Sequence, residues 1–276
     1  MATLDSARIT GALDFRGRVV VVTGGSRGIG RAISEAFLSA GADVVVCGRT
    51  PVADDALPAS TDAGGVSRRA VFVGADVRDP DQASSVMAAA VERFGRIDTL
   101  VNNAGGSPQV DAAEASPRFL ASIVNLNLLA PFYCAQAANA IMQAQAEGGS
   151  ILNITSVSGI RPSPGTAAYG AAKAGLINLT QSLAIEWAPK VRVNAVTGGM
   201  VATDGAEDHY GGIEGMARVA ATVPLGRFGT PDDIAGLCLF LASPMAAYVS
   251  GANLVAHGGG EWPAFLAAAE SSPGTT

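Results

Sequence analysis

Short runs of apolar, mostly β-branched residues alternate along the chain with longer alanine-rich stretches of helical period. The first cycle has an apolar run at 19–23, a helical stretch at 31–40 and a second apolar run at 44–47. Unbroken apolar runs of this length are typical of strands buried on both faces, as in a parallel sheet covered by helices. The pattern therefore predicts an α/β fold in which strands and helices alternate.

The same alternation continues towards the end of the chain. Further strands are predicted at 71–73, 99–102, 150–155, 191–195 and 253–255, and further helices at 82–94, 116–146 and 169–187. This gives about seven strands, and no repeat, long linker or low-complexity block divides them. We therefore expect one domain over 1–276, with its core at about 15–260.

Three stretches are expected to lie outside the sheet and its covering helices. Residues 51–69 contain two prolines and two glycines, which predicts a surface loop or a poorly ordered helix. Residues 203–224 are glycine-rich with scattered apolar positions, which favours a mobile lid. Residues 270–276 form a polar tail that is expected to fray.

Charge and composition narrow the range of partners. With 24 acidic and 18 basic residues, the formal net charge of −6 disfavours nucleic acid and anionic membrane surfaces. The apolar runs are shorter than the roughly 18 to 20 residues of a membrane-spanning helix. The first residues lack the basic start and apolar run of a secretory signal. The three cysteines and two histidines show no metal-ligand spacing. We therefore expect a cytoplasmic protein with no nucleic-acid, membrane or metal partner.

A glycine-rich segment, TGGSRGIG at 23–30, lies between the first predicted strand and helix. Glycines there let the backbone turn tightly and approach a pyrophosphate, whose charge is stabilised by the N–H groups of the helix start. The spacing Gly-x-x-x-Gly-x-Gly differs from the more familiar Gly-x-Gly-x-x-Gly. A simple turn would also explain the glycines, but their place between strand and helix predicts a dinucleotide-binding loop.

The second strand is followed by Arg49, at a place where an NAD-binding chain usually has an acid that holds the ribose 2′-hydroxyl. Arg49 and Arg27 of the glycine-rich segment can instead pair with a 2′-phosphate through charge-assisted hydrogen bonds. The alternative is that both are solvated surface side chains. Because both fall where the adenosine ribose would lie, we expect NADP(H) to be favoured over NAD(H).

Tyr169 and Lys173 are four residues apart, which places them on one face of a predicted helix. A nearby ammonium group stabilises a phenolate and so lowers the tyrosine pKa below about 10, which favours proton exchange with a substrate oxygen. Ser156 comes thirteen positions before Tyr169, and its hydroxyl can donate to that oxygen as charge develops. Asn127, a polar residue in a long apolar helix, can hold a water that links Lys173 to solvent.

Taken together, these motifs resemble those of the classical short-chain dehydrogenase/reductase family. The resemblance runs from about Phe15 to Gly260 and rests on TGGSRGIG at 23–30, Asp76-Val77, NNAG at 102–105, Asn127, Ser156, Tyr169 and Lys173, in the order and spacing of the family. It implies a Rossmann fold, which is a doubly wound three-layer αβα sandwich with a parallel sheet in the order 3-2-1-4-5-6-7.

The resemblance also implies what individual residues do. Tyr169 would be the catalytic acid/base and Ser156 would orient and polarise the carbonyl. Lys173 would bind the nicotinamide ribose and lower the tyrosine pKa, and Asn127 would support the proton relay. The implied cofactor-binding residues are Gly24, Ser26, Arg27, Gly28, Ile29, Gly30, Arg49, Asp76, Val77, Asn103, Ala104, Gly105, Tyr169, Lys173, Val201 and Thr203. The chain departs from the family at Gly198, which stands where a proline is usual and frees the backbone of the nicotinamide-side loop.

The implied activity is an NADP(H)-dependent hydride transfer between nicotinamide and a carbonyl or secondary alcohol. The pattern is closest to 3-oxoacyl-thioester reductases, while NAD-linked sugar and steroid alcohol dehydrogenases share it, so the substrate stays open. The rival interpretation is a non-catalytic NADP(H)-binding sensor or regulator on the same fold. The family also suggests a homotetramer or homodimer, which the Ala, Leu and Ile content of 116–146 and 169–187 fits.

Overall fold

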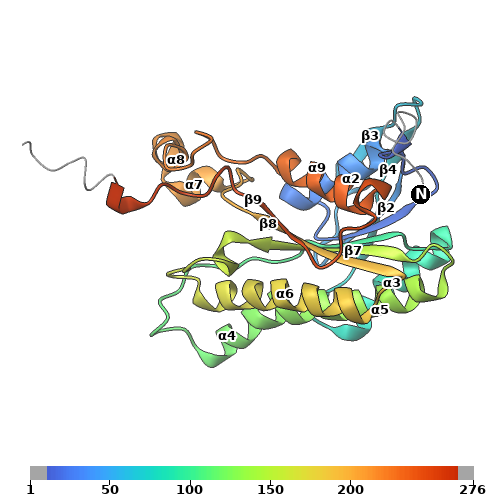
Figure 1. Ribbon diagram of the computed structural model, residues 1–276, viewed down its shortest axis with the longest axis horizontal. Coiled ribbons are helices and arrows are strands. Elements are labelled where there is room, and N and C mark those ends of the chain that lie inside the picture. The colour runs from blue at the N-terminus through green and yellow to red at the C-terminus, as the bar shows by residue number, and fades with distance from the viewer. Residues whose placement is uncertain (1–10, 267–276) are drawn as a thin grey trace, which may run out of the picture.

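The computed structural model describes residues 11–266, and its centre is a parallel seven-stranded sheet (Figure 1). The order β5-β2-β1-β6-β7-β8-β9 becomes 3-2-1-4-5-6-7 when only these strands are numbered, which confirms the predicted Rossmann arrangement. The strands are β1 (Val19–Thr23), β2 (Asp43–Gly48), β5 (Val71–Gly74), β6 (Thr99–Asn102), β7 (Gly149–Ser156), β8 (Val191–Gly198) and β9 (Asn253–Ala256).

Helices cover both faces of this sheet (Figure 1). Val19 and Val21 of β1 pack into one core with α3, α5 and α6, and Val20 and Val22 pack into the other with α2 and α9. Because alternate side chains enter two different cores, the strand has no polar face, which explains its unbroken apolar run. The covering helices are α2 (Gly28–Ser39), α3 (Pro80–Phe94), α5 (Ala130–Ala144), α6 (Ala167–Glu186) and α9 (Pro231–Ala242).

Local sequence signals set the ends of α3. The Asp79 side chain accepts hydrogen bonds from the backbone N–H groups of Asp81 and Gln82, and Pro80 occupies the first helical position, where its missing N–H costs nothing. The helix ends at Gly95, whose φ of 81° lies in the left-handed region. These signals stop the helix shortly before β6 begins.

The connection between β2 and β5 differs from the expected loop or poorly ordered helix. It contains the short 3₁₀ helix η1 (Asp54–Ala56) and an antiparallel hairpin of β3 (Ala59–Thr61) and β4 (Ser67–Arg69). At the hairpin turn, the Asp62 carboxylate accepts from two backbone N–H groups and pairs with Arg68. The turn residues therefore build a small sheet, which prolines and glycines alone did not reveal.

The predicted helix at 116–146 is interrupted by a π-helical turn. It consists of α4 (Pro117–Val124), the π turn η2 (Asn125–Leu129) and α5. The 28-residue stretch Pro117–Ala144 contains an 18-residue window with a mean hydropathy of 1.3, which suffices, by length and composition, for a membrane span. The search for unbroken apolar runs did not detect this apolar helix, because scattered polar residues interrupt its runs. Cys134, Ala138 and Met142 of α5 nevertheless pack into the core beside the sheet.

The predicted lid forms two short helices, α7 (Ala206–Tyr210) and α8 (Gly212–Ala220), between β8 and α9 (Figure 1). The chain after β9 returns to this lid, where the backbone N–H of Trp262 donates to the carbonyl of Thr222 at 2.9 Å. The mobility of the lid stays a prediction. The tail at 270–276 lies outside the described residues.

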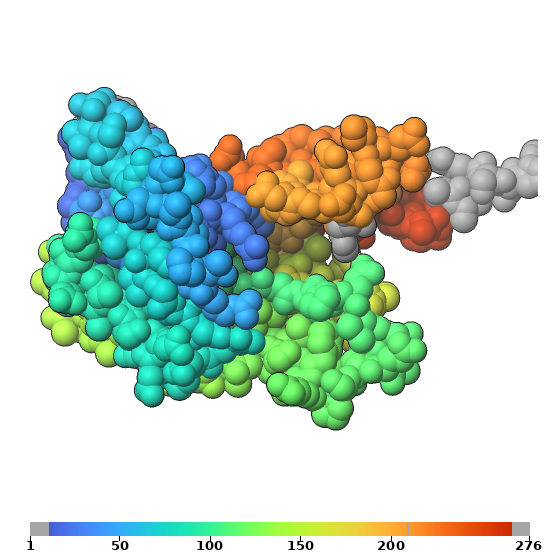
Figure 2. Space-filling model, turned by 180° about the vertical axis from the view of Figure 1, so that it is seen from behind, coloured from blue at the N-terminus to red at the C-terminus, as the bar shows by residue number. Residues whose placement is uncertain are grey.

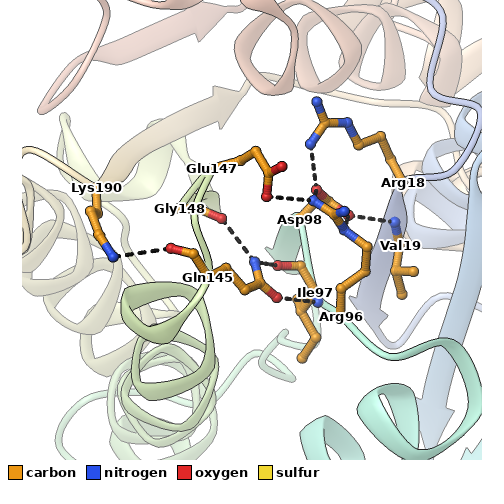
Figure 3. Close-up of polar contacts among 9 residues, drawn as sticks. All are labelled: Arg18, Val19, Arg96, Ile97, Asp98, Gln145, Glu147, Gly148 and Lys190. Atoms are coloured by element: carbon orange, nitrogen blue, oxygen red, sulfur yellow. Dashed lines mark hydrogen bonds and ion pairs between the residues drawn. The ribbon is translucent and has the colours of Figure 1, made fainter.

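A polar network holds the amino-terminal ends of the central strands together (Figure 3). The buried Asp98 carboxylate, just before β6, accepts from the backbone N–H of Val19 at 2.9 Å and pairs with Arg18 and Arg96. The Gln145 side chain donates to and accepts from the backbone of Ile97. These contacts fix β1 and β6 relative to each other at their amino-terminal ends, which leaves the carboxyl ends of the strands for ligand chemistry.

Candidate active site

The predicted functional residues gather at the carboxyl ends of the strands. β1 ends at Thr23, β6 at Asn102, β7 at Ser156 and β8 at Gly198. In open α/β sheets, ligands bind in the crevice beyond these ends, where the strand order reverses. Figure 2 shows the molecule hollowed between the lid, in orange, and the green segment that leads into α4.

The glycine-rich loop has the shape of a phosphate cradle. Gly24 and Gly28 have φ values of 63° and 53°, a backbone conformation that favours glycine. A Cβ on Gly30 would lie 2.3 Å from the carbonyl oxygen of Gly24, so the start of α2 packs directly on the loop. The N-cap residue Arg27 makes no side-chain cap, which leaves the first N–H groups of the helix to a ligand. This geometry fits a dinucleotide pyrophosphate.

The expected adenosine end of the site carries more positive charge than the sequence motifs indicated. Arg27 and Arg49 are both exposed. Asp76 pairs with Arg78, whose hydrogen bond holds the pKa of this carboxyl below its usual range, and Arg49 adds to the lowering. Arg49 therefore lies within electrostatic reach of Asp76. Sequence reasoning missed Arg78, although its place two residues after Asp76 is a usable signal.

The lid meets the glycine loop, whereas the remaining adenosine-side positions lie in the loop itself or in the core. Thr203 at the start of the lid lies 3.8 Å from the position of a Cβ on Gly28. Val77 is buried in the core beside α3. Ser26 and Ile29 are half-buried in the loop itself.

The NNAG segment ties β6 to the glycine loop. The Asn103 side chain donates to the carbonyls of Thr23 and Gly24, and the N–H groups of Asn103 and Ala104 donate to the Thr23 hydroxyl at 3.0 Å. NNAG is therefore also a turn that ties the end of β6 to the end of β1. The same contacts place Ala104 and Gly105 at the edge of the predicted cofactor site.

Ser156, Tyr169 and Lys173 come together from β7 and α6. Tyr169 hydrogen-bonds with Ser156, and the Lys173 ammonium nitrogen lies 5.7 Å from the centre of the tyrosine ring. Lys173 is 3% exposed and donates to the carbonyl of Ile154 at 2.8 Å. Side chains from the end of a strand and the first turns of the following helix thus form one cluster.

Burial dominates the electrostatics of this cluster. It raises the pKa of Tyr169, and the hydrogen bond with Ser156 only partly opposes the increase. It lowers the pKa of Lys173 to about 8. The direction for Tyr169 is opposite to the one expected from a neighbouring lysine, because burial penalises the phenolate more than its neighbours stabilise it.

Asn127 anchors the strand-end loop from within the π turn. Its Oδ1 accepts from the N–H of Gly106, and its Nδ2 donates to the carbonyls of Gly106 and Ile123, each at 2.9 Å. A Cβ on Gly105 would lie 2.7 Å from Asn127 Oδ1 and 3.2 Å from Lys173 Nζ, so both polar groups converge beneath Gly105. π turns often occur at functional sites. The predicted water relay stays a prediction.

Gly198 does not have the freed backbone that the missing proline suggested. It is the last residue of β8 and is paired in register with Ser156 on one side and Ala256 on the other. A Cβ on the next residue, Gly199, would lie 2.7 Å from His257 Cα, so glycine is needed there. Further along, Val201 forms a bridge with Gly229. Strand pairing on both sides therefore restrains this loop, although the usual proline is missing.

A cavity of about 180 Å³ opens beside Ser156. No sequence pattern joins His257, Arg161 and Glu261 in one site, and the last two are a hundred residues apart in the chain. Only the fold brings these three together. The lining residues are Val157, Ile160, Arg161, Gly199, Met200, Val223, His257, Gly260 and Glu261.

Comparison with known proteins identifies the family. The family described as "Enoyl-(Acyl carrier protein) reductase" matches residues 24–261. The structure of a short-chain type dehydrogenase/reductase from Mycobacterium marinum superposes with a TM-score of 0.82 at 31% identity, covering 92% of this chain and 100% of that one. The chain belongs to the short-chain dehydrogenase/reductase family.

Curated relatives of this dehydrogenase/reductase have different substrates in their names. It is 40% identical over 245 residues to L-rhamnose 1-dehydrogenase (NAD(P)(+)) of Azotobacter vinelandii, with 88% of this chain and 96% of the relative covered. It is 38% identical over 245 residues to 3-oxoacyl-[acyl-carrier-protein] reductase of Synechocystis, with the same coverage. The protein is therefore an NAD(P)-dependent oxidoreductase that acts on CH–OH groups or the corresponding carbonyls.

Proposed function

We propose that this dehydrogenase/reductase uses NADP(H) to interconvert a carbonyl compound and a secondary alcohol, with Tyr169 as the acid/base. The observation that carries this proposal is the cluster of Ser156, Tyr169 and Lys173 at the carboxyl ends of the strands. The bound nicotinamide supplies or accepts the hydride. The 3-oxoacyl thioesters and the sugars named for the relatives are both within this proposal.

Each residue of the cluster has a separate task. The Ser156 hydroxyl donates a hydrogen bond to the substrate oxygen. Because burial raises the pKa of Tyr169, its phenol is protonated at neutral pH and can donate a proton when a carbonyl is reduced. Lys173 holds the ribose next to the tyrosine, and Asn127 keeps the loop at 105–106 in place above both.

The preference for NADP(H) rests on the charges at the adenosine end. Asp76 pairs with Arg78, so Arg49 is only a weaker and more distant electrostatic neighbour of this carboxylate, and Arg27 lies on the glycine loop. Two exposed guanidinium groups are then available to a 2′-phosphate. The names of the rhamnose dehydrogenases include NAD(P), which is compatible with use of the phosphorylated cofactor.

Titration with NADPH and NADH, followed by fluorescence quenching, tests the cofactor. We expect Arg49→Ala to weaken NADPH binding at least tenfold, which is about 1.4 kcal/mol, and to leave NADH binding unchanged. Arg93→Ala, which removes another exposed arginine at the far end of α3, is the matched control and should alter neither. Equal or tighter binding of NADH to the unaltered protein would contradict the NADP(H) preference.

Turnover separates the enzyme from a cofactor-binding sensor. Tyr169→Phe removes only the proton-transferring oxygen, so we expect kcat to fall by about 10² to 10⁴ with NADPH affinity within threefold of the unaltered protein. The sensor alternative would instead predict tight NADPH binding without turnover of acetoacetyl thioesters, hexoses or simple secondary alcohols. Cofactor binding and turnover are therefore measured on the same preparations.

We further propose that the chain acts as one domain, in the cytoplasm, as a homotetramer or homodimer. The outer surface of the helix at 117–144 exposes Leu120 and Leu129, at 38% and 37%, which suits a partly apolar subunit contact. Light scattering of the purified protein would give its mass, and a monomeric mass at micromolar concentration would contradict the assembly.

A further inference from the structure

The cavity beside Ser156 has a charged pair at one end. Arg161 Nη2 lies 2.7 Å from Glu261 Oε1, and the two side chains are 40% and 35% exposed. Arg161 follows the short 3₁₀ helix η3 (Val157–Gly159), directly after Ser156, and Glu261 follows β9. The pair therefore joins the catalytic side of the cavity to the returning C-terminal segment and is accessible to a ligand.

The lid reaches the same pair. Burial raises the pKa of Tyr210 on α7, while Arg161 lowers it and Glu261 raises it, so the lid tyrosine lies within electrostatic reach of both charges. The Tyr210 ring packs edge-on against Phe228, with ring centroids 5.1 Å apart. A guanidinium and a carboxylate thus line one end of the cavity, and the lid phenol lies within electrostatic reach of both.

The remaining wall combines a polar ring with apolar side chains. His257 follows β9, and its Nε2 lies 3.5 Å from the position of a Cβ on Gly260, another lining residue. Val157, Ile160 and Val223 supply apolar surface. The imidazole can donate or accept a hydrogen bond, depending on its protonation.

We propose that Arg161, Glu261 and His257 are the recognition site for a hydroxyl-rich, sugar-like substrate, an inference that rests on the proposed function. A carboxylate only accepts hydrogen bonds and a guanidinium only donates them, so the pair offers both to neighbouring hydroxyl groups. Its charges cancel, and it therefore exerts little net attraction on an anionic ligand. The C–H faces of a sugar ring can lie against the apolar wall.

Hydrogen bonding disfavours an acyl substrate at this end of the cavity. A second cavity of about 320 Å³ shares Met200, Val223 and His257 with the first, so the substrate classes are separated by polarity and not by size. An acyl chain has no hydroxyl donors, and laid along this wall it would cover the Glu261 carboxylate without giving it a hydrogen bond, which is unfavourable. A polyhydroxylated ring donates hydrogen bonds to this carboxylate and avoids that cost.

The experiment compares substrates with and without hydroxyl groups beyond the reacting one. Oxidation of D-glucose, D-galactose, D-mannose and cyclohexanol is measured with NADP⁺, and reduction of an acetoacetyl thioester with NADPH. The variants are Glu261→Gln and Arg161→Met. The control is Glu35→Gln, because the Arg31–Glu35 pair on α2 has a similar exposure of 40% and 37% and lies in neither the cavity nor the catalytic cluster. Thermal melting checks that each variant folds.

We expect at least one hexose to have a higher kcat/KM than cyclohexanol and the thioester. Glu261→Gln and Arg161→Met should lower this value at least tenfold, mainly through KM, and leave cyclohexanol turnover within twofold. Glu35→Gln should change neither. The inference is wrong if the thioester or cyclohexanol is preferred over every hexose, or if the variants affect all substrates equally. Turnover of no substrate would contradict the proposed function itself.

Discussion

Replacing Lys173 by methionine is expected to change how folding stability depends on pH. Lys173 is 3% exposed, and burial lowers its pKa from 10.5 to about 8. The unfolded chain therefore keeps this proton up to about pH 10.5, whereas the folded chain releases it above about pH 8. Between these values unfolding takes up a proton, so the contribution of Lys173 makes the free energy of unfolding rise with pH. Below pH 8, the full unfavourable contribution of the buried charge is present.

The magnitude follows from the pKa. A shift from 10.5 to about 8 corresponds to about 3 kcal/mol at about 1.4 kcal/mol per unit. Methionine fills similar space and removes this contribution, but it leaves the carbonyl of Ile154 without its donor, at a cost of about 1 to 3 kcal/mol that does not depend on pH. The free energy of unfolding of the variant, relative to that of the unaltered protein, should thus fall by about 2 to 3 kcal/mol from pH 7 to pH 10.

Thermal melting at pH 7 and pH 10 measures this difference. At about 2 to 4 °C per kcal/mol for a chain of this size, the Tm of Lys173→Met relative to the unaltered protein should fall by about 5 to 10 °C between the two pH values. Burial raises the pKa of Cys47 and Cys238 to about 12, but these thiols contribute equally to the pH dependence of stability in the variant and in the unaltered protein. Lys190→Met is the control, since Lys190 also donates to backbone carbonyls but is exposed to water. A Tm difference independent of pH would refute the reasoning.

Three further predictions concern contacts in the fold and the site. Asp98→Ala should lower the free energy of unfolding in urea by about 2 to 4 kcal/mol, because it removes the acceptor of a buried N–H and two ion pairs, whereas Asp98→Asn should cost less (Figure 3). Gly30→Ala should weaken NADPH binding at least a hundredfold, because its Cβ would lie 2.3 Å from a loop carbonyl; Gly236→Ala, where the Cβ meets open space, should bind normally. Asn127→Ala should lower kcat at least tenfold and speed amide hydrogen exchange at Gly106, and unchanged exchange would show that the loop is not anchored there.

Several elements were predictable because their causes are local. The run at 19–23 is apolar on both faces, and helix α3 carries its own start and stop signals at Asp79 and Gly95. Tyr169 and Lys173 are one helical turn apart, so their common face follows from the period of the helix. The hairpin at 59–69 was missed, because its turn depends on Asp62 binding groups several residues away.

By itself, the sequence determined the alternation of strands and helices, the glycine loop and the candidate catalytic residues, because neighbouring residues carry these signals. Only the tertiary structure decided that Arg161 and Glu261 meet across the cavity and that Asn127 anchors a loop from within a π turn. It also decided the direction of the Tyr169 pKa, which depends on the total burial by surrounding elements and not on the nearest charge in the chain. Contacts between distant segments and the water they exclude arise only when the whole sheet and its helices have assembled.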